Sequence, residues 1–293
     1  MKDKIIYIIK SPHNRNYLIH ILLFVLTVFS TFFVGLSDGI RGALWYSGGI
    51  MTILLTHEMG HFITAKMYGI SATLPYFIPI PLPPFGTMGA VIKMGGRIPH
   101  RKALFDIGAA GPLAGLAVII PSIVIGLKMS QIVPVSSLGE NTITLGDSLL
   151  FRLISRVVLG YIPQGQDVIL HPLAYAGWVG LLVTALNLLP MGQLDGGHVI
   201  YSLFRKRSRF FSLFFYAILL IVCLFFYVGW ILVLILLAIF RKHPPTLNDQ
   251  IPLDRKRQIL GIIILVVFLI SFTPVPFGFG EGLIPLLVKS GWF

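Results

Sequence analysis

Two histidines four residues apart, with a glutamate beside the first, are the part of this sequence best suited to chemistry. Residues His57-Glu58-Met59-Gly60-His61 have the form H-E-x-x-H. Positions i and i+4 of a helix lie on one face about one turn apart, so both imidazoles can bind the same zinc ion. Glu58 then lies where its carboxylate can take a proton from the attacking water. In a soluble enzyme this pattern would indicate a metalloprotease.

The motif lies in an apolar segment, residues 45–70, that is long enough to cross a bilayer. The chain of 293 residues is 56% hydrophobic and only 12% charged. A soluble domain of this length would carry about twice that charged fraction. Several separate apolar runs predict an all-α membrane protein, a polytopic bundle of about six or seven helices. The chemistry would therefore take place below the membrane surface.

The net charge of +12 does not indicate a nucleic-acid partner, because the basic residues gather at the ends of apolar runs, as in cytoplasmic loops. The clusters are Lys2/Lys4/Lys10/Arg15, Arg97/Arg101/Lys102, Arg205/Lys206/Arg207/Arg209, Arg241/Lys242 and Arg255/Lys256/Arg257. We expect them to set the topology and to contact lipid headgroups. Cys223 is the only cysteine, which excludes an internal disulfide.

The predicted spans are residues 18–36, 43–67, 103–127, 173–189, 210–240 and 258–272. A cytosolic N-terminus, without a removable signal peptide, puts the basic loops on one side and residues 128–172 on the other. This charge pattern favours a cell (inner) membrane. The run 210–240 would make a helix of about 46 Å against a hydrocarbon core of about 30 Å. We therefore expect a helical hairpin near residues 227–229.

Two further stretches are not predicted to be spans. Residues 74–96 contain many prolines followed by short β-prone pieces and glycines, which favours a re-entrant loop or β-hairpin against the membrane. Such backbone must be covered by protein or line a wet cavity, because lipid cannot satisfy its amides. Residues 148–161 carry Arg152 and Arg156 on one face and apolar residues elsewhere, which is typical of an interfacial helix.

A catalytic zinc ion takes three protein ligands and keeps one position open, so a third ligand is required. Asp195 follows the fourth span in the pattern N-x-x-P-x-x-x-x-D-G, where Asn187 and Pro190 should end the helix. Such an interruption can hold an aspartate at membrane depth, where a carboxylate is costly and marks function. From the residues alone, Asp195 is either a ligand or a helix cap.

With H-E-x-x-H at residues 57–61 and N-x-x-P-x-x-x-x-D-G at residues 187–196, the chain resembles the site-2 protease family of intramembrane zinc metalloproteases. Glycine-rich pieces at residues 86–90 and 111–115 support the resemblance. It implies one zinc ion (Zn²⁺) per chain, held by His57, His61 and Asp195. It also implies that Glu58 is the catalytic base and that the site lies toward the cytosolic side.

The resemblance covers about residues 18–201, and no stretch has room for the PDZ or CBS domain that many family members add. We therefore divide the chain into a cytosolic basic N-terminus (1–17), an intramembrane metalloprotease core (18–201), and C-terminal membrane helices with a short tail (202–293).

Residues near the predicted site have two readings each. Asn187 either satisfies backbone at the helix break or donates a hydrogen bond to the developing oxyanion. Gly86, Thr87 and Gly89 belong to a loop with two interpretations. It is either a simple connecting turn or an edge strand that pairs with an unwound substrate. His198 either supports the site or is an ordinary histidine at a packed interface.

We expect hydrolysis of peptide bonds within or near transmembrane segments, with transmembrane proteins or peptides and the lipid bilayer as partners. A zinc transporter would need polar groups across several spans, and only one cluster is visible. A zinc protease with a glutamate as third ligand is disfavoured, because Glu140 and Glu281 lie in loop or tail. A catalytically silent membrane chaperone is the third rival. The sequence identifies neither the substrate nor the oligomeric state.

Overall fold

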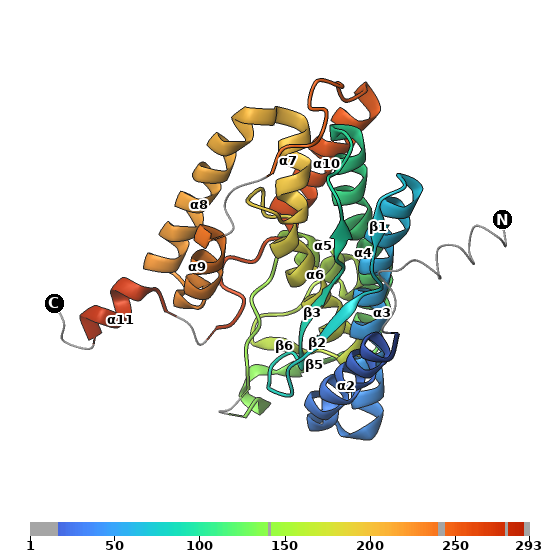
Figure 1. The fold of residues 1–293 in the computed structure, drawn as a ribbon. Helices are drawn as coiled ribbons and strands as arrows, with labels where there is room; N and C mark the ends of the chain where they lie inside the picture. Colours follow the sequence, from blue (N-terminus) through green and yellow to red (C-terminus); the bar gives the residue numbers. More distant parts are fainter. Residues whose placement is uncertain (1–16, 140–141, 240–243, 279–280, 290–293) are drawn as a thin grey trace.

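The computed structural model of the chain describes residues 17–139, 142–239, 244–278 and 281–289. The predicted basic clusters at residues 2–15 and 241–242, and Glu140, lie outside these described residues. Most of the described chain is helical, with three small two-stranded sheets. Figure 1 shows the long helices running alongside one another, with the strands laid against them.

The apolar runs form helices close to the predicted bounds, because a backbone in lipid must make its hydrogen bonds within the segment. The helices that coincide with predicted spans are α2 (Tyr17–Gly35), α3 (Gly39–Met67), α4 (Arg101–Lys128), α6 (Pro172–Asn187) and α10 (Arg255–Ser271). Three helical stretches of the described residues are long and apolar enough to cross a membrane: Tyr17–Met67, Arg101–Lys128 and Asp195–Phe225. The total of six or seven membrane helices stays a prediction.

The long run at residues 210–240 is broken where the hairpin was predicted. Helix α8 (Ser208–Phe225) ends before a 3-10 turn at Val228–Trp230, and α9 (Ile231–Ile239) follows. The turn is held from outside, because the Trp230 indole N–H donates to the carbonyl of Pro274 at 2.7 Å. At 9 residues, α9 is about 14 Å long, roughly half the thickness of a hydrocarbon core. The described part of α9 is therefore too short for a full crossing.

Several elements were missed or only partly anticipated. The predicted interfacial helix is α5 (Leu149–Leu159), which begins where the Ser148 hydroxyl accepts from the backbone of Phe151. The antiparallel strands β5 (Gln131–Pro134) and β6 (Gln166–Ile169) were not predicted. Neither were the short helices α7 (Asp195–Phe204) and α11 (Leu283–Lys289). Helix α7 matters most, because it begins at the predicted third ligand.

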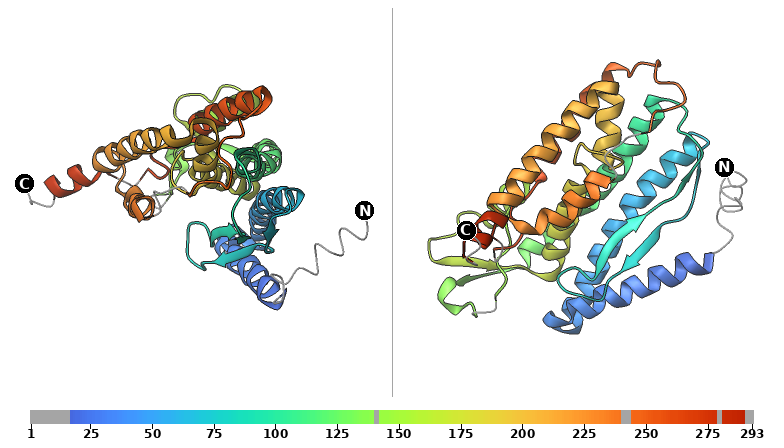
Figure 2. Two further views of the ribbon diagram at one scale, coloured as in Figure 1. Left: turned by 45° about the horizontal axis from the view of Figure 1, so that its top comes forward. Right: turned by 60° about the vertical axis from the view of Figure 1, so that its left-hand side comes forward.

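The proline- and glycine-rich stretch forms two pairs of antiparallel strands. Strand β1 (Ser71–Ala72) pairs with β4 (Met94–Gly95), and β2 (Tyr76–Pro79) pairs with β3 (Thr87–Val91). Strand β2 lies against α2, as Figure 2 shows. The turn between β2 and β3 is covered by protein. The Tyr175 hydroxyl donates to the carbonyl of Pro84, and the Tyr46 hydroxyl donates to that of Phe85. The Ser30 hydroxyl donates to the carbonyl of Gly86.

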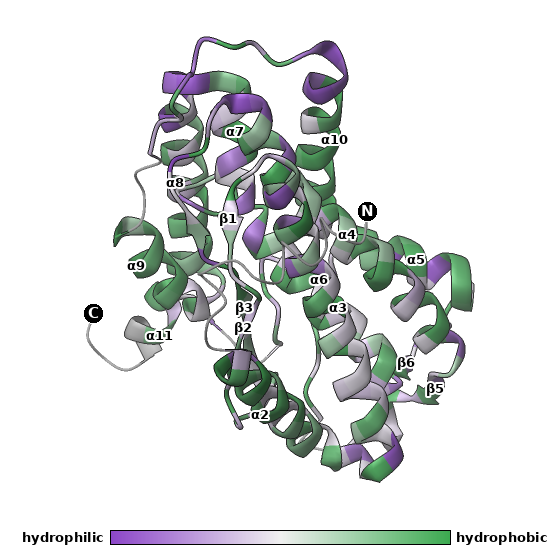
Figure 3. Cartoon of the chain, turned by 45° about the vertical axis from the view of Figure 1, so that its right-hand side comes forward, coloured by the Kyte–Doolittle hydropathy of each residue, from purple (hydrophilic) through white to green (hydrophobic). Residues whose placement is uncertain are grey.

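The centre of the molecule is formed by α3, α4 and α6, which pack closely on one another. Figure 3 shows mainly hydrophobic helices, with one group of hydrophilic residues at the end of the molecule near the start of α10. That end also holds the α7–α8 turn, Arg205–Arg207. Buried Arg101 ties the end together by donating to the carbonyls of Ser202 and Ile251.

Candidate metal centre

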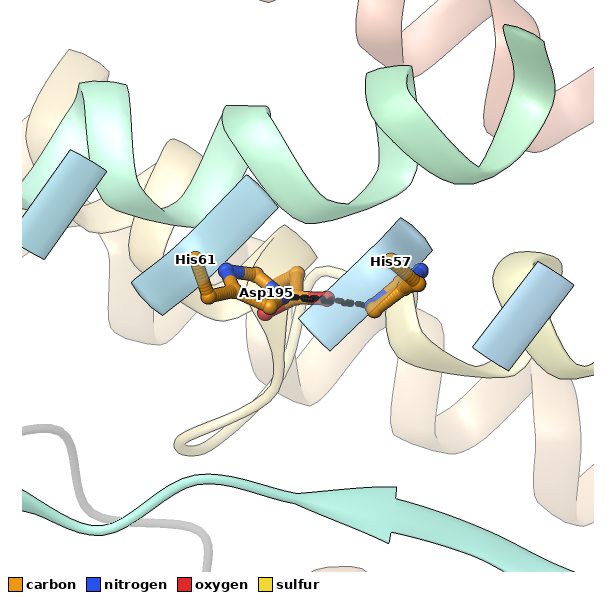
Figure 4. A group of neighbouring side chains, drawn as sticks. All are labelled: His57, His61 and Asp195. Atoms are coloured by element: carbon orange, nitrogen blue, oxygen red, sulfur yellow. Dashed lines mark hydrogen bonds and ion pairs between the residues drawn. The ribbon is translucent and has the colours of Figure 1, made fainter. Parts of the chain in front are cut away.

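His57 and His61 lie on α3, one turn apart, and both side chains are buried. Asp195, the first residue of α7, lies between the two histidines in the view of Figure 4. The Nε2 atoms of the two histidines are 3.2 Å apart. The Oδ2 atom of Asp195 is 3.2 Å from each of them. The three residues predicted as ligands are therefore brought together, each offering one ligand atom to a common point.

These three distances fit a tetrahedral zinc ion. Zinc bonds to histidine nitrogen and carboxylate oxygen are about 2.0–2.1 Å long, which puts neighbouring ligand atoms about 3.3 Å apart in a tetrahedron. A carboxylate and two imidazole nitrogens are also the ligand chemistry that zinc takes in catalytic sites. The donor set and its spacing thus suit one zinc ion, and three ligands leave the fourth position free.

Glycines on α4 make room for the two imidazoles. A Cβ atom at Gly111 would lie 2.0 Å from Nε2 of His61, and one at Gly115 would lie 3.2 Å from Nδ1 of His57. On the facing helix, a Cβ atom at Gly60 would lie 2.5 Å from the carbonyl oxygen of Ala110. Helices α3 and α4 can therefore approach closely at the level of the motif. The glycine-rich piece 111–115 noted in the sequence has this packing role.

The orientation of His61 is set by a backbone group of α4. Its Nδ1–H donates to the carbonyl of Ile107 at 2.8 Å, which leaves Nε2 to face His57 and Asp195. Hydrogen bonds of this kind fix the tautomer and ring orientation of metal-binding histidines. The sequence carried no signal for this carbonyl, because any residue type at position 107 would supply it.

Asp195 reaches the site because the chain turns tightly between α6 and α7. Helix α6 ends at Asn187 as predicted, and Gly196 then packs so closely that a Cβ atom would lie 1.9 Å from the carbonyl oxygen of Leu188. Asp195 stands in the first turn of α7, where the positive end of the helix dipole favours an anionic side chain. The helix-cap reading is not supported, since Leu194 is the cap residue and no side chain caps the helix.

Glu58 is buried next to the histidines, with a relative exposure of 6%. The backbone N–H of Ile92 donates a hydrogen bond to its carboxylate. Ile92 directly follows β3, so the strand and the predicted catalytic base are connected through one residue of the hairpin. Sequence reasoning did not find Ile92.

Of the other candidate residues, Asn187 lies next to a histidine, and Gly86, Thr87 and Gly89 belong to the hairpin. The side-chain Nδ2 of Asn187 is 3.5 Å from Nε2 of His57. Gly86 lies at the tip of the hairpin against α2, and the Thr87 hydroxyl donates to the carbonyl of Ile78 within the hairpin. Gly89 has open space around its Cβ position. Asn187 is therefore at the site, whereas Gly86 and Thr87 shape the strand.

His198 lies on α7, three residues after Asp195, and packs against Gly108 of α4, whose Cβ atom would lie 2.7 Å from its own. Its backbone N–H donates to the carbonyl of Leu194. The metal-ligand group of the described residues comprises His57, His61 and Asp195 without it.

Comparison with known proteins places this site in a family. The sequence profile of peptidase family M50 matches residues 45–230, which include both motifs. A rice protein named probable zinc metalloprotease EGY1, chloroplastic, is 34% identical over 300 residues, covering 89% of this chain and 50% of that protein. The Arabidopsis thaliana EGY1 protein is 36% identical, covering 80% of this chain and 44% of its own length.

The Arabidopsis EGY2 protein, also named a probable zinc metalloprotease, is 31% identical over 83% of this chain and 43% of its own length. The chain thus spans about half the length of these curated relatives. No solved structure matches it. With its two motifs folded together inside the matched region, the chain belongs to peptidase family M50, the site-2 protease family that its sequence resembles.

Proposed function

We propose that this protein is an intramembrane zinc endopeptidase that hydrolyses peptide bonds within or near transmembrane segments. The observation that carries the proposal is the group of three ligand atoms 3.2 Å apart, inside an apolar helix bundle. Glu58 is buried beside this group. The printed names of the relatives, which call them probable zinc metalloproteases, support the same activity.

In this proposal His57, His61 and Asp195 hold the ion. A zinc ion bound there would polarise the substrate carbonyl and make water a stronger nucleophile near neutral pH. Glu58 takes the proton of the attacking water and returns it to the leaving amine. The side-chain amide of Asn187, next to His57, offers N–H donors to the developing oxyanion.

The substrate would bind along strand β3. In the part of the chain that the structure describes, β3 pairs only with β2, so its other edge has no partner strand. In Figure 4 a strand of the hairpin runs below the three ligand residues. An unwound substrate segment would add to this edge as a further strand, with Gly89 leaving room for its approach. Substrate helices that contain Gly or Pro should therefore be cut faster, because they unwind at lower cost.

The proposed orientation follows the basic residues. The end of the bundle that carries Arg205–Arg207 and the start of α10 would face the cytosol, and with it the N-terminus and the metal centre. A cell (inner) membrane is the proposed location. The plant relatives are named chloroplastic, which describes those proteins. The metalloprotease core would be residues 18–201, followed by C-terminal membrane helices.

The test compares the purified wild type with Glu58→Gln, which keeps the size of the side chain and removes the base. We measure zinc per chain and cleavage of a panel of single-span substrates in detergent. The expected result is one zinc ion in both proteins and cleavage in the wild type alone. Absence of zinc from the wild type under metal-replete conditions would overturn the proposal. Zinc transport that survives in Glu58→Gln would identify a transporter instead.

A further inference from the structure

The ladder of hydrogen bonds along the hairpin is interrupted beside Glu58. Between the pairs Ala72↔Met94 and Tyr76↔Val91, three residues of one strand (Thr73, Leu74 and Pro75) face two of the other (Ile92 and Lys93). Pro75 has no N–H to give to a ladder, which favours a break at this point. The break lets the N–H of Ile92 leave the ladder and donate to the Glu58 carboxylate.

The backbone of Lys93, the residue that follows Ile92, is held by one residue, Thr73. The Thr73 hydroxyl accepts a hydrogen bond from the backbone N–H of Lys93 at 3.0 Å. The Thr73 backbone N–H donates to the carbonyl of Lys93 at 2.9 Å. Thr73 is itself 3% exposed, so water does not replace these bonds freely. The clamp therefore holds both polar groups of Lys93.

The side chain of Ile92 provides a second anchor. It packs against a small apolar cluster that includes Phe62 of α3 and Ile107 of α4. Met59, the residue after Glu58, joins the same cluster. The Ile92 peptide is thus held on one side by packing and on the other by Thr73, and it directs its N–H to the carboxylate.

We infer that Thr73 is a positioning residue for the reaction: by clamping Lys93 it aims the Ile92 N–H at Glu58 and so fixes the orientation of the catalytic base. The inference rests on the proposed function, since it concerns the same carboxylate. A carboxylate has several lone pairs, and a hydrogen bond to one of them restricts its rotation while others remain available to accept the proton. Because Ile92 continues β3, the same piece of backbone would also hold a substrate on that strand in register with the base.

The test is a comparison of Thr73→Val with Thr73→Ser. Valine keeps the shape but removes the acceptor of the Lys93 N–H, whereas serine keeps the hydroxyl. We expect Thr73→Val to lower kcat by about tenfold, because a misplaced catalytic group slows the chemical step, while KM changes less than about twofold. Thr73→Ser should restore kcat to within about twofold of the wild type. Both variants should retain one zinc ion per chain.

Amide hydrogen exchange supplies a readout that does not depend on cleavage. Peptides that contain Ile92 and Lys93 should exchange faster in Thr73→Val, while peptides from α4 should be unchanged. The matched control is Thr27→Val on α2, another buried threonine, whose hydroxyl donates to the carbonyl of Leu23 in its own helix. It should keep wild-type kcat. If Thr73→Val does not retain zinc, Thr73→Cys, which replaces the hydroxyl by a weak acceptor, takes its place.

A Thr73→Val variant with wild-type kcat and wild-type exchange at Ile92 and Lys93 would overturn the inference. So would a Thr73→Ser variant as impaired as Thr73→Val, because the effect would then not come from the hydroxyl. A wild type that cleaves no substrate would overturn the proposed function and this inference with it. An active wild type combined with an unaffected Thr73→Val would overturn the positioning role alone.

Discussion

Two similarly apolar helical stretches of this protein are packed in very different ways. In the most apolar window of Arg101–Lys128, 50% of the residues are buried, whereas in Asp195–Phe225 the share is 11%. The first stretch is α4, which covers the metal centre; the second leads into α8, whose apolar side chains are largely exposed. Hydrophobicity alone therefore does not distinguish a helix packed inside the protein from one with an exposed apolar face.

Glycines account for the closer packing of α4 compared with α8. On α4, a Cβ atom at Gly108, Gly111 or Gly126 would come within 2.7 Å, 2.0 Å and 2.2 Å of a neighbouring atom. Helix α8 has no glycine and carries bulky residues such as Phe210 and Phe214 on its exposed face. In a membrane, small residues let helix backbones approach closely, and this packing drives association. The contact pattern thus divides the molecule into a closely packed site region and a loosely attached α8–α9 arm, residues 208–239.

The largest expected effect comes from filling one of these contacts. In Gly111→Ala the new methyl group would lie 2.0 Å from Nε2 of His61, so the imidazole must move out of position. We expect zinc affinity and cleavage to fall by about 100-fold or more. Zinc titration and cleavage assays measure both.

The matched control is Gly48→Ala on α3. Among the residues that the structure describes, nothing outside its own helix backbone and chain neighbours lies within 4 Å of a Cβ atom there, and the residue is likewise a helical glycine in an apolar segment. Zinc affinity and cleavage should stay within about twofold of the wild type, as at other sites without contacts. Equal losses in the two variants would show that the contact with His61 is not responsible for the effect of Gly111→Ala.

An intermediate effect is expected where the arm is attached. Trp230, at the α8–α9 turn, is 3% exposed, stacks on Phe272 and donates to the carbonyl of Pro274. Trp230→Ala should weaken the attachment by about 3 kcal/mol, which is typical of a buried tryptophan replaced by alanine. Faster amide exchange or proteolysis across residues 208–239 would measure it, with zinc content unchanged.

Phe214→Ala, at a side chain 53% exposed, is the control for the arm and should change exchange by less than about twofold. Loss of zinc in Trp230→Ala would contradict the division into two regions, because the arm would then support the metal centre.

The smallest effect concerns Asp249, in the loop between α9 and α10. Burial alone would raise the pKa of Asp249, but hydrogen bonds from Thr246 and Tyr201 outweigh it and hold this pKa below its usual value. A lowered pKa in the folded state stabilises the protein above the unfolded pKa of about 3.9, and this contribution is lost as pH falls through the folded pKa. Thermal unfolding should therefore show Asp249→Asn to be less stable than the wild type at pH 6.

The difference between the two proteins should shrink steadily below about pH 4 as Asp249 becomes protonated in the wild type. Because Tyr201 belongs to α7, the hydrogen bond from its hydroxyl to Asp249 joins the loop between α9 and α10 to the site region. A difference that stayed constant with pH would mean that the carboxylate charge plays no part in this attachment.

Much of the fold could be predicted because a membrane helix is recognised from the length and composition of one continuous apolar segment. The bounds of α2, α3, α4, α6 and α10 follow the apolar runs, and the break between α8 and α9 follows from a run too long for one span. The helix α7 and the strands β5 and β6 were not predicted. They are short, and their formation depends on packing against the longer helices and on pairing with distant segments.

The same division holds inside the metal centre. The pair His57 and His61 was predictable because helical spacing is a local property. Asp195 was recognised as a candidate from its motif, but its approach to His57 spans 138 residues of sequence. The hydrogen bond from Ile92 to Glu58 was beyond sequence reasoning, because a backbone N–H has the same chemistry at every residue except proline.

The sequence by itself determined which residues could bind a metal ion and which segments are apolar enough to cross a membrane. Side-chain types, the i and i+4 spacing and the length of apolar runs are properties of short segments. Only the tertiary structure decided that three ligand atoms meet at 3.2 Å, that glycines of α4 make room for them, and that a break in a hairpin directs an N–H to Glu58. Those contacts join distant segments, and their geometry depends on how whole helices and strands pack.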